Sequence, residues 1–278
     1  MKTLYISDLD GTLLNDQAEL SPQSAHLLNR LTARGMHFSV ATARTSATVV
    51  QMLTDISLSV PAILMNGVCI YDLSANRPVH VNYIPHPSAL QVIECIHRCH
   101  AEGFLYTMHE TGLSTWYERC STPHARQFME ERQQKYGKPF TPIADFSALA
   151  GQMIYYSLSD TEEKLAPLYQ ALRDIPGIRC EFYRDIYQTD HWYLEICSEC
   201  ASKFNALRYL QKEYGFDRTV GFGDNLNDLP LFAACDLRIA VSNAHENVRR
   251  QADILIGSNR EDSVARWLTD HYDKETIR

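Results

Sequence analysis

The sequence predicts an α/β protein with a parallel-sheet core, into which a second domain of mixed helices and strands is inserted. Short apolar runs alternate with helical patterns at both ends of the chain, as they do in βαβ units. In the middle this alternation becomes less regular and aromatic residues are more frequent. The 278 residues suffice for about two domains of ordinary size.

The N-terminal part contains three apolar runs that we expect to be buried strands, at residues 3–7, 37–41 and 62–65. A helix is expected to begin at Ser21-Pro22, because a hydroxyl can cap a helix and proline suits its first turn. Gly35 is expected to end that helix. A second helix is expected over residues 47–55.

The middle of the chain is expected to form the inserted α+β domain, over residues 84–191. Its expected helices are 88–101, 122–136 and 161–173, and its expected strands are 104–108, 153–158 and 178–184. Candidate linkers lie at 84–87 and 189–191. The core is then formed by residues 1–83 and 192–278. In its second part we expect helices at 202–214, 227–234 and from 261, and strands at 219–223 and 237–241.

Composition and charge exclude several classes of protein. The chain has 26 Lys and Arg against 34 Asp and Glu, a net charge of −8, which is poorly suited to coating nucleic acid. No apolar run approaches the roughly 18 residues that a membrane span needs. Asp8 and Asp10 interrupt any N-terminal secretory signal, so we expect a cytoplasmic protein. Its eight cysteines are then expected to stay reduced.

The strongest chemical signal is the string Asp8-Leu9-Asp10-Gly11 with the three residues that follow it, at the end of the first strand. Two carboxylates this close are electrostatically costly unless a cation or a proton compensates. A bare Asp-x-Asp-Gly also occurs in ordinary turns. The full seven-residue string after a buried strand is far more specific.

A second acidic loop runs from Gly223 to Asp228 after another apolar strand, and by itself it could be an ordinary strand-to-helix loop. Together with the first string it supplies Asp8, Asp10 and Asp224, an oxygen-rich set that suits Mg²⁺. Thr42 could hold a phosphate through its hydroxyl group. Lys203 could do so as a cation just inside an expected helix start, because helix N-termini favour anions. Each of these two residue types alone is more often a helix cap or a solvated surface charge.

Along the chain, the four segments are the aspartate pair at Asp8 and Asp10, then Thr42, then Lys203, and then the loop from Gly223 to Asp228. In this order they resemble the haloacid dehalogenase superfamily of phosphatases. The tail after the last strand, with Ser242-Asn243-Ala244 and residues 258–262, resembles the Cof-type branch, as does Asn66-Gly67. The long insert looks like that branch's C2-type cap. The resemblance implies a Rossmann-like parallel-sheet core with an inserted α+β cap domain.

The resemblance also implies a role for each matching residue. Asp8 would be the nucleophile, and Asp10 the general acid and then the general base. Mg²⁺ would be held by Asp8, the backbone carbonyl of Asp10, and Asp224. The phosphate would be held by Thr42, Lys203, Asn227 and the backbone N–H groups of Leu9 and Ala43. Supporting or substrate-contacting positions would be Arg44, Asn66, Gly67 and Asp228.

The sequence departs from the family pattern at three positions where glycine is usual: Ala43, Phe204 and Ser263. None of these changes removes a reactive group, so we expect activity to survive. Ala43 could shift which substrates fit, because it adds a methyl group where the backbone approaches the phosphate.

We therefore expect a Mg²⁺-dependent phosphomonoester hydrolase that acts on small phosphorylated metabolites, with sugar phosphates as the first candidates. A phosphomannomutase-like phosphotransferase would use the same aspartyl-phosphate. A non-catalytic phospho-receiver is a third alternative, although the built-in acid and base at Asp10 argues against it. The sequence does not define the oligomeric state; nucleic acid and membrane are not expected partners.

Several other patterns are weaker. Residues 95–100 contain two Cys and two His, and Cys197 and Cys200 resemble half of a metal or redox site, but buried or surface cysteines are the simpler interpretation of both. Trp192 is expected in a core. The dipeptide Arg184-Asp185 could contact a sugar or form a solvated turn.

Overall fold

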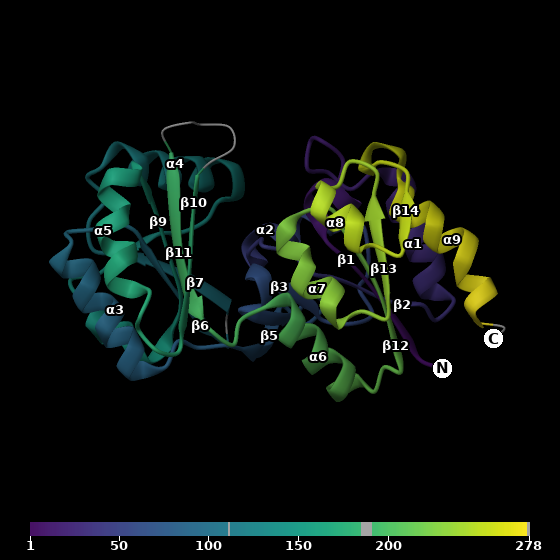
Figure 1. The fold of residues 1–278 in the computed structure, drawn as a ribbon, viewed down its shortest axis with the longest axis horizontal. Coiled ribbons are helices and arrows are strands. Elements are labelled where there is room, and N and C mark those ends of the chain that lie inside the picture. Colours follow the sequence, from purple (N-terminus) through teal and green to yellow (C-terminus); the bar gives the residue numbers. More distant parts are fainter. Residues whose placement is uncertain (111, 185–190, 277–278) are drawn as a thin grey trace. The chain divides into compact units, whose positions relative to one another are not determined.

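The computed structural model describes residues 1–110, 112–184 and 191–276, with side chains as far as Tyr272 in the last helix. The chain forms two compact units (Figure 1). The first consists of Met1–His80 and Ser202–Arg278, and the second of Val81–Ala201. The first unit contains a parallel sheet and the second an antiparallel sheet with helices, which confirms the predicted fold class.

The two ends of the inserted unit differ from the sequence expectation. The expected boundary at residue 191 falls ten residues too early, because β11 (Trp192–Ser198) pairs with β9 (Met153–Asp160) and β10 (Ile178–Arg184). The expected linker at 84–87 is already part of the unit, since Ile84 is buried in its core and donates to the Met153 carbonyl. Positions 189 and 190 of the other expected linker lie outside the described residues.

The parallel sheet of the first unit has β1 near its centre. Its strands, in spatial order, are β14 (Ile254–Ile256), β13 (Leu237–Val241), β12 (Arg218–Gly223), β1 (Thr3–Ser7) and β2 (His37–Val40). Both neighbours of β1 therefore run in the same direction as β1. The four residues before Asp8 are fully or almost fully buried, as expected for a strand that is covered on both faces.

Helices cover both faces of this sheet (Figure 1). They are α1 (Pro22–Ala33), α2 (Ser46–Met52), α6 (Lys203–Tyr214), α7 (Leu229–Ala234), α8 (Glu246–Gln251) and α9 (Ser263–Thr276). Leu4 and Ile6 pack with α6 and α7, whereas Tyr5 points to the other face and contacts Tyr272 of α9. Ser21 caps α1 as predicted, because its side chain accepts a hydrogen bond from the Ser24 N–H.

A small antiparallel sheet continues beside β2. It contains β3 (Ala62–Leu64), β4 (Cys69–Asp72) and β5 (Arg77–Val81). A parallel β-bridge between Ala41, which directly follows β2, and Ile63 of β3 connects the small sheet to the main sheet. The sequence predicted β3 but neither β4 nor β5; β5 is only partly buried and lacks an apolar run.

The second unit is built on a six-stranded sheet. Its spatial order is β10, β11, β9, β6 (Phe104–His109), β7 (Gly112–Tyr117) and β8 (Thr141–Pro142), and only the β7–β8 pair is parallel. Helices α3 (His86–Arg98) and α5 (Glu162–Leu172) pack on one face with Leu105. Helix α4 (Pro123–Tyr136) lies on the other face, where Phe128 stacks on Phe104 at a centroid distance of 5.0 Å.

Two features of this unit agree with the sequence. Trp192 packs against the hydrophobic core on the α3–α5 face, as expected. The three predicted helices are present with bounds within a few residues of those expected. Within the described ranges of the whole chain, no helix combines the length and the apolar character needed to cross a membrane.

Candidate active site

The polar residues singled out in the sequence gather at the carboxyl ends of three neighbouring parallel strands. Asp8 directly follows β1, Asp224 directly follows β12, and Thr42 follows β2. Because β1 lies between β12 and β2, the three strand ends are adjacent. In open parallel sheets this edge is where ligands bind.

The centre of the site is a buried lysine between two carboxylates. The Nζ of Lys203 lies 2.7 Å from Asp8 Oδ1 and 2.7 Å from Asp228 Oδ1. Lys203 is 1% exposed, Asp8 5% and Asp228 0%. Helix α6 begins at Lys203, where the Ser202 side chain accepts the Asn205 N–H, and this start fixes the lysine at the sheet edge.

Charge is not balanced within this group. With Asp224 included, three carboxylates face one ammonium. Burial, and then the Asp228 carboxylate, raise the pKa of Asp8 well above its usual value. Burial also raises the pKa of Asp224 to about 6. Burial alone would lower the pKa of Lys203, but the attraction of Asp228 and Asp8 outweighs it and raises that pKa.

This acidic group fits a divalent cation. The nearest carboxylate oxygens of Asp8, Asp224 and Asp228 all lie within 4.8 Å of one another. The three carboxylates and Lys203 sum to a charge of −2, which a divalent cation neutralises. Oxygen donors of this kind suit Mg²⁺. The Asp10 carboxylate does not belong to this cluster.

Asp228 also shapes the loop that carries Asp224. Its Oδ2 accepts hydrogen bonds from the backbone N–H of Asp224 at 2.9 Å and of Asn225 at 3.0 Å. Asp228 thus binds Lys203 with one oxygen and the second acidic loop with the other. Thr12 completes the contact between the two loops by donating to Asp224 Oδ1 at 2.8 Å.

Gly11 is required by the close approach of these loops. Its φ is +75°, and a Cβ there would lie 2.5 Å from Asp224 Oδ2. The first acidic string can therefore pass directly beside Asp224 only with glycine at this position.

Asp10 has a different environment from Asp8. Its carboxylate is held by a two-point ion pair from Arg44, with Nε at 2.6 Å from Oδ2 and Nη2 at 2.5 Å from Oδ1. The Asp10 side chain is about half exposed. The sequence suggested Arg44 as a supporting residue, but nothing in the local pattern indicated that it pairs with Asp10.

The remaining phosphate-binding candidates lie around Thr42. Arg44 donates its backbone N–H to the Thr42 hydroxyl at 3.2 Å, and Asn66 donates its backbone N–H to the Thr42 carbonyl at 2.9 Å. The Asn227 amide donates to Asn66 Oδ1 at 3.3 Å. Asn66 adopts a left-handed conformation with φ of +53°. Thr42, Asn66 and Asn227 are thus connected although they lie on three separate loops.

The structure requires glycine at position 67 but accommodates alanine at position 43. A Cβ on Gly67 would lie 2.2 Å from the Ser202 carbonyl oxygen, just before Lys203, so only glycine fits. Ala43 is exposed, and its φ is not in the left-handed region, so the extra methyl group is accommodated without strain. Among the described residues, neither the Leu9 N–H nor the Ala43 N–H has a hydrogen-bond acceptor.

Two asparagines support the first acidic string and had no assigned role in the sequence interpretation. Asn243 donates to the Gly11 carbonyl at 2.8 Å, and its own Oδ1 accepts the Asn259 backbone N–H. Asn259 donates to the Leu14 carbonyl at 2.9 Å. Both residues lie in the tail segments that resembled the Cof-type branch, and this was the only sequence signal for them.

The two Cys and two His of residues 95–100 do not gather into one site; His97 instead lies with Glu118 and Asp145, and the ligand atoms of these three residues are all within 4.8 Å of one another. His97 lies 2.9 Å from the Glu118 carboxylate, whereas Cys95 points to the Ala171 carbonyl. Glu118 also accepts the Phe146 backbone N–H, so this carboxylate has a structural role. All eight cysteines are free, and Cys197 is buried while Cys200 is exposed. Of the dipeptide Arg184-Asp185, Asp185 lies outside the described residues.

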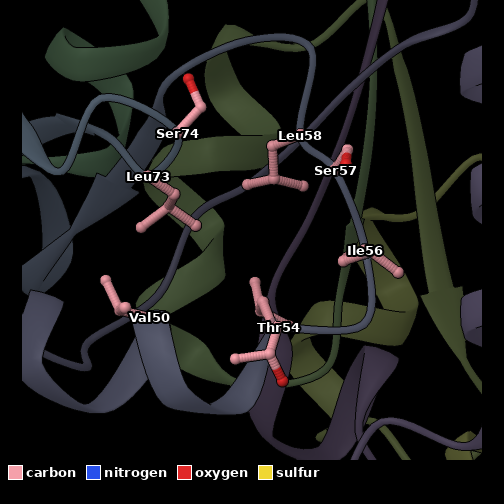
Figure 2. Close-up of a pocket in the computed structure, with 8 residues that line it drawn as sticks. Val50, Thr54, Ile56, Ser57, Leu58, Leu73 and Ser74 are labelled. Atoms are coloured by element: carbon pink, nitrogen blue, oxygen red, sulfur yellow. The ribbon is translucent and has the colours of Figure 1, made fainter.

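A hollow of about 270 Å³ in the first unit does not belong to the acidic cluster (Figure 2). Its eight lining residues, from α2, the loop after it and the β4–β5 turn, are Val50, Leu53, Thr54, Ile56, Ser57, Leu58, Leu73 and Ser74. None of them carries an ionisable group. This hollow therefore offers no acid, base or metal ligand.

The chain is similar to known proteins over almost its whole length. Residues 5–268 match the family of haloacid dehalogenase-like hydrolases. The chain is 28% identical over 276 residues to the pyridoxal phosphate phosphatase YbhA of Escherichia coli, with 95% of this chain and 96% of that protein covered. It is 23% identical to the 5-amino-6-(5-phospho-D-ribitylamino)uracil phosphatase YitU of Bacillus subtilis, with 97% of each covered.

The fold is also similar to a solved structure. The crystal structure of TM0651 from Thermotoga maritima matches with a TM-score of 0.78 and 23% identity, covering 98% of this chain and 97% of that one. The protein belongs to the haloacid dehalogenase-like hydrolases, as its motifs predicted. It is an enzyme of this hydrolase family, and the relatives named above are phosphatases.

Proposed function

We propose that the protein is a Mg²⁺-dependent phosphomonoesterase that hydrolyses small phosphorylated metabolites through an aspartyl-phosphate on Asp8. The observation that carries the proposal is the state of the Asp8 carboxylate. Its Oδ1 is bound by Lys203, whereas Oδ2 accepts no hydrogen bond from any residue in the described ranges. The Asp8 side chain is therefore fixed in place but keeps one oxygen available for attack on phosphorus.

Asp8, the Asp10 backbone carbonyl and Asp224 would hold Mg²⁺, with Asp228 supporting this group through the Asp224 loop. When bound, the ion supplies positive charge that reduces the repulsion between the carboxylates and the phosphate dianion. The excess negative charge of the cluster and the raised pKa values of Asp8 and Asp224 support this assignment.

The protein's own residues would bind and orient the phosphate. Lys203 supplies a buried positive charge at the carboxylate that attacks. The Thr42 hydroxyl and the Asn227 amide can donate to phosphate oxygens, as can the N–H groups of Leu9 and Ala43. Donors fixed at the positions where charge develops are the main source of rate enhancement in phosphoryl transfer.

Asp10 would donate a proton to the leaving oxygen and later remove one from the attacking water. In the structure its carboxylate is bound by Arg44. Asp10 must leave this ion pair to reach a substrate, and a phosphate dianion is a suitable replacement partner for the Arg44 guanidinium. Arg44 would then exchange Asp10 for the substrate at the start of each cycle.

The proposed substrates are small for two reasons. The two phosphatases named above act on pyridoxal phosphate and on a phosphorylated ribitylaminouracil, and each aligns with almost the entire chain. The net charge of −8 also disfavours phosphorylated polymers. Sugar phosphates remain the first class to test.

The proposal is tested by measuring phosphate release from hexose and pentose phosphates, pyridoxal phosphate, nucleotides, a phosphopeptide and an aryl phosphate. We expect kcat/KM to be highest for a small metabolite, activity to require Mg²⁺, and Asp8→Asn to abolish turnover without loss of folding. A preference for the phosphopeptide would contradict the substrate class. Phosphate release that requires a bisphosphate activator would instead favour the phosphotransferase.

A further inference from the structure

Lys138 of the second unit is a buried lysine that forms no ion pair with any residue in the described ranges. It follows the left-handed Gly137 that ends α4, and it is 6% exposed. Its ammonium lies 4.2 Å from the centroid of the Tyr106 ring and 5.2 Å from that of Phe140. Within the described ranges, no carboxylate pairs with Lys138 Nζ and no acceptor lies at hydrogen-bond distance from it.

The contrast with the other buried lysine is informative. Lys203 is also buried, but two carboxylates lie 2.7 Å from its ammonium. Burying an ammonium without such partners is unfavourable, and aromatic rings compensate only in part. Burial, and to a smaller extent the nearby Arg132 guanidinium, lower the pKa of Lys138 to about 7. The surroundings of Lys138 are therefore deficient in negative charge.

A second cation, Arg132, adds to this deficit. Its guanidinium lies over the Phe128 ring at 3.4 Å from the centroid. Its only carboxylate contact in the described part of the chain is with its sequence neighbour Glu131 at 3.9 Å, a long distance for an ion pair. Arg132 and Lys138 are also linked through the backbone, since the Lys138 N–H points to the Arg132 carbonyl at the end of α4.

The acidic group on this side of the sheet does not supply the missing charge. Glu195 of β11 is affected by Arg132 but forms no ion pair with Lys138. Burial raises the pKa of Glu195 to about 7, so at neutral pH this carboxyl is only partly ionised. Tyr155 and Tyr183, which hydrogen-bond to Glu195, are neutral at this pH because their pKa values are raised by burial.

We propose that Lys138 and Arg132 form a binding site in the second unit for an anionic carboxylate or phosphate group, with the rings of Tyr106 and Phe140 as its apolar lining. Such a group would give the Lys138 ammonium the partner that the described residues do not supply, and Arg132 can bind it with two parallel hydrogen bonds. The anion can come from a separate small molecule or from a second acidic group on the substrate, in which case the inference rests on the proposed function.

The first experiment uses the full chain and follows the Lys138 side chain by NMR during a titration with succinate, a dicarboxylate without phosphorus. We expect a saturable shift and a rise of at least one unit in the Lys138 pKa. Lys138→Met should weaken succinate binding at least tenfold in calorimetry, and Lys138→Arg should retain most of it. Lys135→Met is the matched control, because Lys135 is exposed and lies three residues away.

The second experiment compares hydrolysis of 3-phosphoglycerate and glycerol 3-phosphate, which differ in a carboxylate. If the anion is part of the substrate, Lys138→Met should reduce the ratio of their kcat/KM values at least tenfold, and Lys135→Met should not. If the anion is a separate molecule, succinate binds but this ratio does not change. The inference is overturned if succinate causes no Lys138-dependent shift and the ratio is also unchanged. The NMR titration remains decisive even if the chain hydrolyses neither ester.

Discussion

Lys203 and Asp228 lie 25 positions apart in the chain, and their 2.7 Å contact leaves neither side chain exposed. The contact joins the start of α6 to the acidic loop after β12. Because the other partner of Lys203 is Asp8, one ammonium links the two acidic loops of the site. The arrangement of the carboxylates therefore depends on this lysine.

Lys203→Met should strongly reduce both stability and activity. It removes the cation from a buried cluster and leaves Asp8 and Asp228 uncompensated, which costs about 3–5 kcal/mol in comparable sites. We expect urea denaturation to show a loss of this size and phosphate release to fall at least a hundredfold. Lys212→Met, on the exposed side of the same helix, is the control and should leave both unchanged. Equal stability of the two variants would contradict the described role of Lys203.

Arg44→Gln should reduce activity while leaving the stability of the fold almost unchanged. The Arg44–Asp10 ion pair is partly exposed, so its loss should change stability by less than about 1 kcal/mol. The substrate phosphate loses the guanidinium that replaces Asp10 as its partner in the proposed cycle, and we expect kcat/KM to fall at least tenfold. Arg30→Gln, at an exposed site on α1, provides the control for loss of charge. A variant with unchanged kcat/KM would remove Arg44 from the proposed cycle.

The metal-free protein should become more stable as the pH falls from 7 towards 5. The pKa of Asp224 is raised to about 6 in the folded state and that of Asp8 is also raised, so the folded state takes up more protons than the unfolded state in this range. Mg²⁺ should reverse the trend, because it binds the ionised carboxylates. The measurement is the urea midpoint at each pH, with EDTA or with excess Mg²⁺.

The control for this pH dependence is Asp224→Asn, in which the Asp224 contribution is absent. The metal-free variant should show a weaker gain in stability on acidification than the native protein, and Mg²⁺ should stabilise it less. If the native protein and the variant had the same pH profile with and without Mg²⁺, Asp224 would not be part of the cation site.

Gly67→Ala should be far more damaging than an alanine at another left-handed glycine. The new Cβ would lie 2.2 Å from the Ser202 carbonyl oxygen, so the segment before Lys203 has to move. We expect a loss of more than about 2 kcal/mol and a matching loss of activity. Gly215→Ala, also at a positive φ but with nothing within 4 Å of the added Cβ, should cost about 1 kcal/mol and leave kcat unchanged.

Much of this architecture could be predicted from local patterns. Asp8, Thr42 and Asp224 each follow a short apolar run, and this pattern alone predicts that they lie at strand ends. Contacts between distant segments had no such signal. The pairing of Arg44 with Asp10 and the support of Gly11 by Asn243 depend on how separate loops meet, and a one-dimensional pattern does not record this.

The inserted unit shows the same limit more clearly. The sequence assigned the residues of β11 to the second part of the core, because a candidate linker precedes them. In the structure, the backbone of β11 pairs with β9 and β10 of the inserted unit. Lys138 in a charged, exposed-looking segment gives no sign that it is buried on Tyr106. Burial of single polar residues follows from tertiary packing, which local composition does not determine.

Trapping the covalent intermediate tests the central claim most directly. During turnover of a good substrate, borohydride should reduce the acyl phosphate and convert Asp8 to homoserine, which mass spectrometry of the N-terminal peptide detects. We expect this conversion at Asp8 only when both Mg²⁺ and substrate are present, and not in Asp8→Asn. Full turnover with no modification of Asp8, or with modification of a different carboxylate, would contradict the assignment of Asp8 as the nucleophile.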